Sequence, residues 1–76
     1  MNQRLPSLTA RDVIRALEKA GFAVTRTSGS HARLVHTDDP RRQVTVPMHT
    51  SDMRRGTLRA IIGQAGLSVS QFIALL

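Results

Sequence analysis

A change of hydrophobic period at Gly21 constrains the fold of this 76-residue chain more than any other feature. Before Gly21, apolar residues recur every three or four positions over about three turns, which is typical of an amphipathic helix. These residues are Val13, Ile14, Ala16, Leu17 and Ala20. We expect Thr9 to cap this helix, Asp12 to complete the capping box, and Gly21 to end the helix in a left-handed conformation. After Gly21 the period becomes two, which indicates β-strands.

Three alternating runs carry this shorter period: FAVTRT at 22–27, SHARLVH at 30–36 and RQVTVP at 42–47. Turn-forming segments, SGS and DDPR, separate the runs. The pattern therefore predicts a three-stranded antiparallel meander.

The register of the first hairpin follows from keeping apolar residues opposite each other. Pairing Val24 with Leu34 requires an odd-length loop, which we expect to be Ser28-Gly29-Ser30, with Gly29 free to adopt a positive φ. The other pairs expected are His31 with Thr27 and Arg33 with Thr25. These polar side chains would lie on the face away from the apolar set, together with Gln43 and Thr45.

Two further helices are expected in the C-terminal third. Thr57 should cap the first, which carries Leu58, Ile61, Ile62 and Ala65. Ser68 and Gln71 have capping-box spacing and should open a short final helix with Val69, Phe72, Ile73 and Leu76 on its apolar side. The sequence thus predicts a single α+β domain over 1–76, in the order α-β-β-β-α, with helices on one face of a three-stranded antiparallel sheet.

The composition excludes several classes of protein. With no cysteine, the chain has no disulfide, thiolate zinc site or cysteine nucleophile. The histidines are irregularly spaced and no carboxylates are positioned for magnesium, so we expect neither a metal nor a cofactor. No apolar stretch approaches the length of a membrane span, and we expect a cytoplasmic protein.

The charge points to a polyanionic partner. The chain has eleven basic and five acidic residues, which gives a net charge of +6, and Lys19 is the only lysine. Guanidinium groups match phosphate oxygens bidentately, so nucleic acid is the first candidate, although a basic surface can also serve solubility alone. Phe22 and Phe72 are the only aromatic residues and belong to the expected core, which argues against a module that stacks single-stranded bases.

The expected open face holds the groups that metal-independent RNA cleavage needs: a proton acceptor, a proton donor and positive charge near the phosphate. Histidine suits the proton transfers because its ordinary pKa is about 6.5. Arg33 follows His31 by two positions and projects from the same face roughly 7 Å away. A histidine at a strand end is, however, more often a solvated or turn-bonded residue.

The other two histidines are assigned differently. His36 falls on the apolar face, where a hydrogen-bonded structural role is favoured. His49 lies in a loop after Val46 and Pro47, and it is either a loop anchor, which we favour, or a second proton-transfer group.

The sequence resembles the HicA family of small toxins from HicA–HicB toxin–antitoxin systems. The segments that carry the resemblance are VIRALEKAGF at 13–22, GSHARL at 29–34, VTVPMH at 44–49, GTLRAIIGQAGLS at 56–68 and the terminal QFIALL. The resemblance implies a fold similar to double-stranded-RNA-binding domains. It also implies metal-independent cleavage of mRNA that blocks translation and depends on the histidine of the Gly-Ser-His motif, which is His31 here.

The resemblance further implies a HicB-type antitoxin, mostly acidic, which would cover the His31 face in a hetero-oligomer; the free toxin is expected to be a monomer. On this reading Arg33 stabilises the phosphate, while Gly29 and Ser30 shape the turn that presents the imidazole. Further RNA-backbone contacts are expected from Arg26, Arg41, Arg42, Arg54 and Arg55, each of which can also be read as part of a solvated basic face. A non-catalytic RNA-binding module of the same fold remains the alternative, and a DNA-binding subunit is less favoured because no helix-turn-helix pattern is visible.

Overall fold

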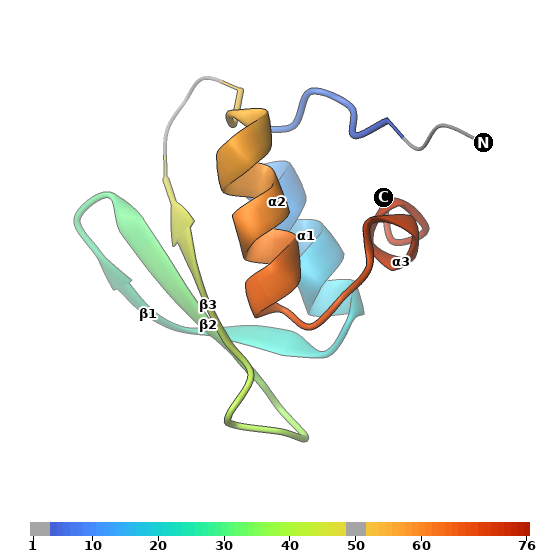
Figure 1. Cartoon of the computed structure of the whole chain (residues 1–76). Helices are drawn as coiled ribbons and strands as arrows, with labels where there is room; N and C mark the ends of the chain where they lie inside the picture. Colours follow the sequence, from blue (N-terminus) through green and yellow to red (C-terminus); the bar gives the residue numbers. More distant parts are fainter. Residues whose placement is uncertain (1–3, 49–51) are drawn as a thin grey trace.

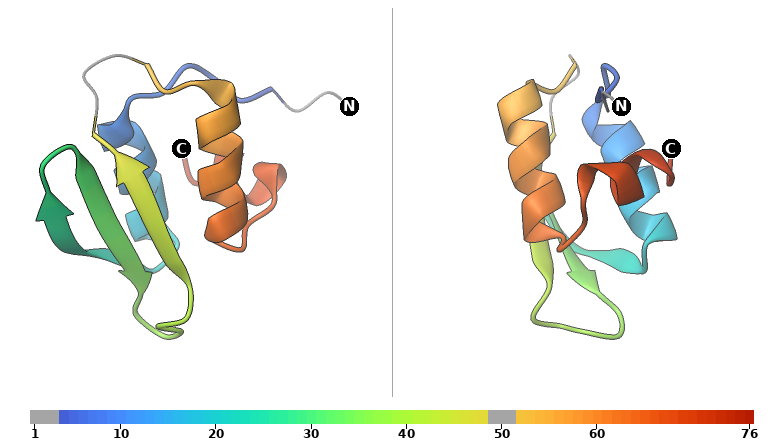
Figure 2. Two further views of the ribbon diagram at one scale, coloured as in Figure 1. Left: turned by 60° about the vertical axis from the view of Figure 1, so that its left-hand side comes forward. Right: turned by 45° about the vertical axis from the view of Figure 1, so that its right-hand side comes forward.

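The computed structural model describes residues 4–48 and 52–76 and contains three helices and one sheet. The elements in chain order are α1 (Ala10–Lys19), β1 (Phe22–Ser28), β2 (His31–His36), β3 (Gln43–Pro47), α2 (Arg55–Gln64) and α3 (Val69–Ile73). The strands form an antiparallel sheet in the order β1-β2-β3, and the helices gather on one side of it (Figures 1 and 2). The α+β order and the antiparallel sheet confirm the prediction from the sequence. In this part of the chain, no helix is both long and apolar enough to cross a membrane.

Reciprocal capping boxes begin two of the helices, as their spacing predicts. The Thr9 hydroxyl accepts a hydrogen bond from the Asp12 amide at 3.3 Å, while the Asp12 carboxylate accepts one from the Thr9 amide at 3.1 Å. Ser68 and Gln71 repeat the pattern at the start of α3, at 3.0 and 2.8 Å. Each box satisfies two amide groups that the helix itself leaves unpaired.

The start of α2 differs from the prediction. Thr57 lies inside the helix rather than at its cap, and the N-cap is Arg54, whose side chain makes no capping hydrogen bond. The Arg54 carbonyl accepts a hydrogen bond from the Leu58 amide at 2.9 Å, so Thr57 lies within the first helical turn.

The core lies between the sheet and the helices and contains both phenylalanines, as expected. Its buried apolar residues are Leu5, Leu8, Ala10, Val13, Ala16, Leu17, Phe22, Ala32, Leu34, Val44, Val46, Leu58, Ile61, Ile62, Ala65 and Phe72. Of the residues expected on apolar faces, Val24 is 41% exposed and Leu76 is 45% exposed, whereas the partly buried ones pack against the core: Ile14, Ala20, Val69 and Ile73. All β1 residues from Val24 to Ser28 are exposed, so the distal half of this strand extends beyond the core.

The first hairpin pairs Val24 with Leu34 as predicted, but the structure reaches this pairing with a shorter turn and a β-bulge. The connecting turn has only two residues, Gly29 and Ser30, and not the expected three. A β-bulge between Val24 and Arg26 compensates for the shorter turn, because Thr25 is an extra residue in β1 with no partner in β2. The pairs beyond it are therefore Arg26 with Arg33, Thr27 with Ala32, and Ser28 with His31. The predicted pairs of His31 with Thr27 and Arg33 with Thr25 are wrong.

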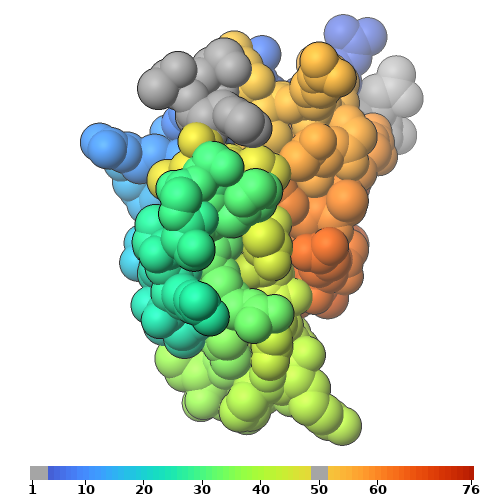
Figure 3. Space-filling view, turned by 90° about the vertical axis from the view of Figure 1, so that its left-hand side faces the viewer, coloured from blue at the N-terminus to red at the C-terminus, as the bar shows by residue number. Residues whose placement is uncertain are grey.

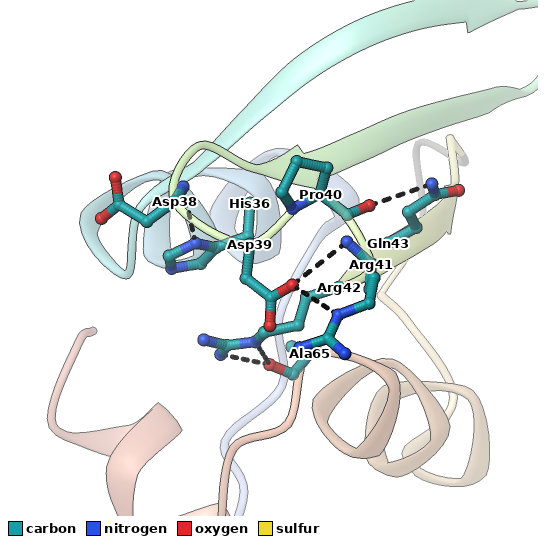
Figure 4. A network of polar contacts seen from close by, with 8 residues as sticks. All are labelled: His36, Asp38, Asp39, Pro40, Arg41, Arg42, Gln43 and Ala65. Atoms are coloured by element: carbon teal, nitrogen blue, oxygen red, sulfur yellow. Dashed lines mark hydrogen bonds and ion pairs between the residues drawn. The ribbon is translucent and has the colours of Figure 1, made fainter.

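At the opposite end of β2, His36 has the structural role that its position predicts. Its Nδ1 accepts a hydrogen bond from the Asp38 amide at 3.1 Å (Figure 4). This leaves Nε2 to donate to the Ala20 carbonyl at 3.1 Å. The ring also meets Phe22 edge to face, with 5.1 Å between centroids. Both ring nitrogens are thus hydrogen-bonded, and the Nε2 contact joins β2 to the end of α1.

Gly21 and Gly63 should respond to alanine in opposite directions. Gly21 has a φ of +99°, and an added Cβ would lie 2.8 Å from His36 Nε2, so Gly21→Ala should lower the free energy of unfolding by about 1–3 kcal/mol. Gly63 is in α2 and an added Cβ would meet no atom within 4 Å, so Gly63→Ala should raise it by about 1 kcal/mol. Urea titrations of both variants check this, and equal losses would contradict it.

The first capping box should make stability depend on pH. Hydrogen bonds from the Thr9 backbone and side chain, with a smaller effect of Arg15, lower the pKa of the Asp12 carboxyl below its ordinary value of 3.8. A lowered pKa contributes stability that is present above the unfolded value and lost as pH falls through the folded value. The free energy of unfolding of the wild type should therefore exceed that of Asp12→Asn, and the difference should be larger at pH 7 than at pH 3. Urea titration at both pH values measures it. A difference independent of pH would contradict this.

Candidate functional site

The two-residue turn of the first hairpin presents His31 to solvent. Gly29 takes the positive φ of +57° at the first turn position, which glycine adopts without strain. The Met48 amide, just after β3, donates a hydrogen bond to the Ser30 carbonyl and ties the turn to the neighbouring strand. The imidazole of His31 is exposed, and its Nδ1 lies 3.3 Å from the Ser30 hydroxyl oxygen. This contact orients the ring and leaves Nε2 directed away from Ser30.

An open, shallow depression lies beside this imidazole on the outer face of the sheet. Its lining residues are Arg26, Ser28, His31, Ala32, Arg33 and Thr45. They come from all three strands, and Figure 3 shows the surface of the hairpin, in green, next to β3 in yellow-green. The site therefore depends on the sheet register and not on a flexible loop.

The sequence predicted His31 and Arg33 as neighbours on this face and Arg26 as one of several RNA-backbone contacts, and the structure places Arg26 beside the other two. The alternation of β1 would place Arg26 on the same side as Phe22, but the bulge at Thr25 shifts the phase and turns it to the side of His31. Ser28 is an addition to the site, because it pairs directly with His31. A signal for this register exists in the sequence, since Gly-Ser is a known two-residue hairpin turn.

Positive charge at the depression is not neutralised by a neighbouring carboxylate. In residues 4–48 and 52–76, the ion pairs are Asp12 with Arg15, at 4.0 Å, and Asp39 with Arg41, at 3.2 Å. Neither pair involves Arg26 or Arg33. The two guanidinium groups therefore face solvent with their full charge, which favours an anionic ligand.

The other arginines expected at the site lie elsewhere. Arg41 and Arg42 belong to the β2–β3 turn, at the end of the sheet opposite to the Gly29-Ser30 turn (Figure 1). Arg42 donates through Nε, at 3.0 Å, and through Nη2 to the Ala65 carbonyl (Figure 4). Its Cζ lies 5.3 Å from the centre of the Phe22 ring. These contacts give Arg42 a part in packing, whereas Arg41 remains exposed beside Asp39.

Arg54 and Arg55 lie at the start of α2, at the same end of the molecule as the Gly29-Ser30 turn (Figure 1). Both are exposed, and Arg55 Nη1 donates to the Leu5 carbonyl at 2.7 Å. Arg54 is thus the more available of the two for a ligand. His49, the candidate second proton-transfer group, lies outside the described residues. Where the structure describes the chain, no three His, Asp or Glu side chains come together in a way that suits a metal ion.

The comparison with protein families gives one match. The sequence model of a family described as "HicA toxin of bacterial toxin-antitoxin" matches residues 10–67, which run from the start of α1 to just beyond α2 and include the whole sheet. No curated protein matches the chain. Because the family match covers well over half of the 76 residues, the chain belongs to the HicA family, the toxins of bacterial toxin–antitoxin systems.

Proposed function

We propose that this toxin is a metal-independent endoribonuclease that cleaves mRNA in the cytoplasm and thereby blocks translation, with His31 as the general base or acid. The observation that carries the proposal is the exposed imidazole of His31, oriented by Ser30 beside a depression with two uncompensated arginines. Membership of a toxin family supplies the biological setting. The excess of basic over acidic residues, with a net charge of +6, suits a polyanionic substrate.

The contact between Ser30 and His31 suits the first proton transfer. If Nδ1 donates its hydrogen to the Ser30 hydroxyl oxygen, Nε2 is the basic nitrogen and can accept the proton of a ribose 2′-OH. The 2′-oxygen then attacks the adjacent phosphorus, and the 5′-oxygen leaves with a proton. Charge that builds up on the phosphate oxygens is stabilised by the guanidinium of Arg33.

The proton for the leaving 5′-oxygen needs a source. His36 is unsuitable, because both of its ring nitrogens are already hydrogen-bonded at the far end of β2. His49 remains the candidate among the histidines; without it, water would supply the proton. Arg41, Arg54 and Arg55 are proposed to contact the RNA backbone, whereas Arg42 is already held by Ala65 and Phe22.

An antitoxin must restrain such an activity, and toxin–antitoxin membership implies that partner. We propose a HicB-type protein, mostly acidic, that covers the His31 face in a hetero-oligomer, while the free toxin is a monomer. The charge of the exposed face supports an acidic partner, since Arg26 and Arg33 have no carboxylate beside them in the described parts of the chain. Covering the depression would block both the base and the phosphate-stabilising charge.

A non-catalytic RNA-binding module is the second candidate, and the open, shallow shape of the depression favours it. His31→Ala separates the two functions. In the nuclease, cleavage should fall by about 10² or more, because one general acid–base group typically contributes that factor. RNA affinity should change little, since the arginines remain. Cleavage of labelled mRNA and RNA binding at fixed salt, measured side by side, check the prediction.

Because His31 is exposed, its substitution should leave the unfolding midpoint near that of the wild type, which serves as the control for folding. Unchanged toxicity and unchanged cleavage by His31→Ala would contradict the catalytic assignment. If the wild type does not cleave RNA, and His31→Ala binds RNA as well as the wild type does, the RNA-binding module is favoured.

The reaction route predicts the chemistry of the ends. Attack by the 2′-oxygen should leave a 2′,3′-cyclic phosphate on one fragment and a 5′-hydroxyl on the other. An RNA with a single 2′-deoxy nucleotide at the cleavage position should resist cleavage there, because the nucleophile is missing. Mass spectrometry of the fragments measures both effects, and products with 3′-hydroxyl and 5′-phosphate ends would exclude this route.

A further inference from the structure

The bulge at Thr25 produces an arrangement of like charges that the fold itself does not need. Arg26 and Arg33 are directly opposite each other in the β1–β2 ladder. Like charges in opposite positions destabilise an antiparallel pair. Both residues are exposed, and neither side chain makes a hydrogen bond or ion pair within the described segments, 4–48 and 52–76. Their juxtaposition thus calls for an explanation outside the free protein.

Four other arginines have a partner within the described residues. Arg42 donates to the Ala65 carbonyl, and Arg55 donates to the Leu5 carbonyl. Arg15 and Arg41 have aspartate partners. Arg11, Arg54 and Arg59 likewise have no hydrogen-bonded or ionic partner in the described residues, but they do not line the depression. Arg26 and Arg33 both line it, together with His31.

We propose that Arg26 and Arg33 form a two-guanidinium site for one phosphoryl group beside His31, and that the bulge at Thr25 is the element that builds it. The proposal deepens the proposed function, because the group bound there would be the phosphate at the scissile bond. Cβ atoms of directly opposite residues lie about 4.5–5.5 Å apart, so two guanidinium groups can reach the same tetrahedral oxyanion. Each guanidinium can donate two parallel hydrogen bonds to phosphate oxygens.

The bulge is required because β1 has to place Phe22 on the helix side of the sheet and Arg26 on the opposite side. Phe22 must lie on the helix side of the sheet, where it is buried in the core. In a regular strand, Arg26 would follow it on that same side, since the two are four residues apart. The extra residue at Thr25 changes the phase, and the Thr25 hydroxyl donates to the Arg33 carbonyl at 3.3 Å, which fastens the bulge to β2. Thr25 is therefore a positioning residue for the arginine pair.

The test is thermal unfolding of the complete chain, with chloride replaced by inorganic phosphate at constant ionic strength. The wild-type midpoint should rise by about 5 °C at saturating phosphate, because a ligand that binds only the folded state stabilises it. Arg26→Gln and Arg33→Gln should each reduce this rise at least threefold. Arg11→Gln is the matched control, because it removes the same charge from an exposed position on α1 and should keep the full rise.

A charge-conserving variant separates geometry from net charge. The double substitution Arg26→Thr with Thr27→Arg keeps the composition but places the guanidinium opposite Ala32, on the other side of the hairpin. It should lose the response to phosphate. If this variant, or both single arginine variants, responds like Arg11→Gln, the two-arginine site is wrong. A wild type that does not respond at all also overturns it.

A second probe identifies which phosphate the site takes. A 2′-deoxy dinucleotide cannot be cleaved by the 2′-oxygen route, so its diester reports binding alone. A response to the diester supports a site for the scissile phosphate. A response to inorganic phosphate alone would overturn the assignment to the scissile bond, because it would show a site for a terminal phosphate.

The same variants distinguish this proposal from the proposed function. Phosphate binding that is lost in Arg26→Gln, in a protein that cleaves no RNA, would support the oxyanion site while rejecting the nuclease. Cleavage that depends on His31 but is equal in Arg26→Gln and Arg11→Gln would support the nuclease while rejecting the paired site.

Discussion

The register of the β1–β2 hairpin is the constraint on which both the core and the candidate site depend. One short strand buries Phe22 beneath the helices at its start and turns Arg26 toward the outer face near its end. A single extra residue, Thr25, reconciles these two requirements. Without that change of phase, either a core phenylalanine or a site arginine would lie on the wrong side of the sheet.

The far end of the same hairpin explains why the register is held firmly. His36 connects the end of β2 to the Ala20 carbonyl at the end of α1, and Arg42 connects the β2–β3 turn to the end of α2 through the Ala65 carbonyl. The two side chains also contact the same ring, that of Phe22. This cluster fixes the sheet against both helices, so that the exposed end of the hairpin can present polar and charged groups without being stabilised by burial.

Local signals in the sequence predicted much of this fold. The capping boxes at Thr9 and Ser68 form as expected because a cap involves side chains only three residues apart. The alternation of Val44 and Val46 correctly placed β3 with its apolar side in the core. The structural role of His36 could also be predicted, because the alternation in β2 places it on the apolar side of the sheet.

The errors arise where a local signal competes with a distant one. Val24 can pair with Leu34 either through a three-residue loop or through a two-residue turn with a bulge in β1. The alternation of apolar and polar residues cannot distinguish these two arrangements. Thr57 is a good capping residue, yet the helix begins earlier because the Arg54 carbonyl takes the first hydrogen bond. The role of Arg42 depends on Ala65, which is 23 positions away, and no pattern along the chain indicates that contact.

Nuclear Overhauser effects across the β1–β2 hairpin, measured on the free protein in solution, would establish the register on which the core and the candidate site depend. We expect cross-strand backbone contacts between Val24 and Leu34 and between Arg26 and Arg33, with Thr25 unpaired and Ser28 opposite His31. A continuous ladder that pairs Thr25 with Arg33 and Thr27 with His31 would contradict it.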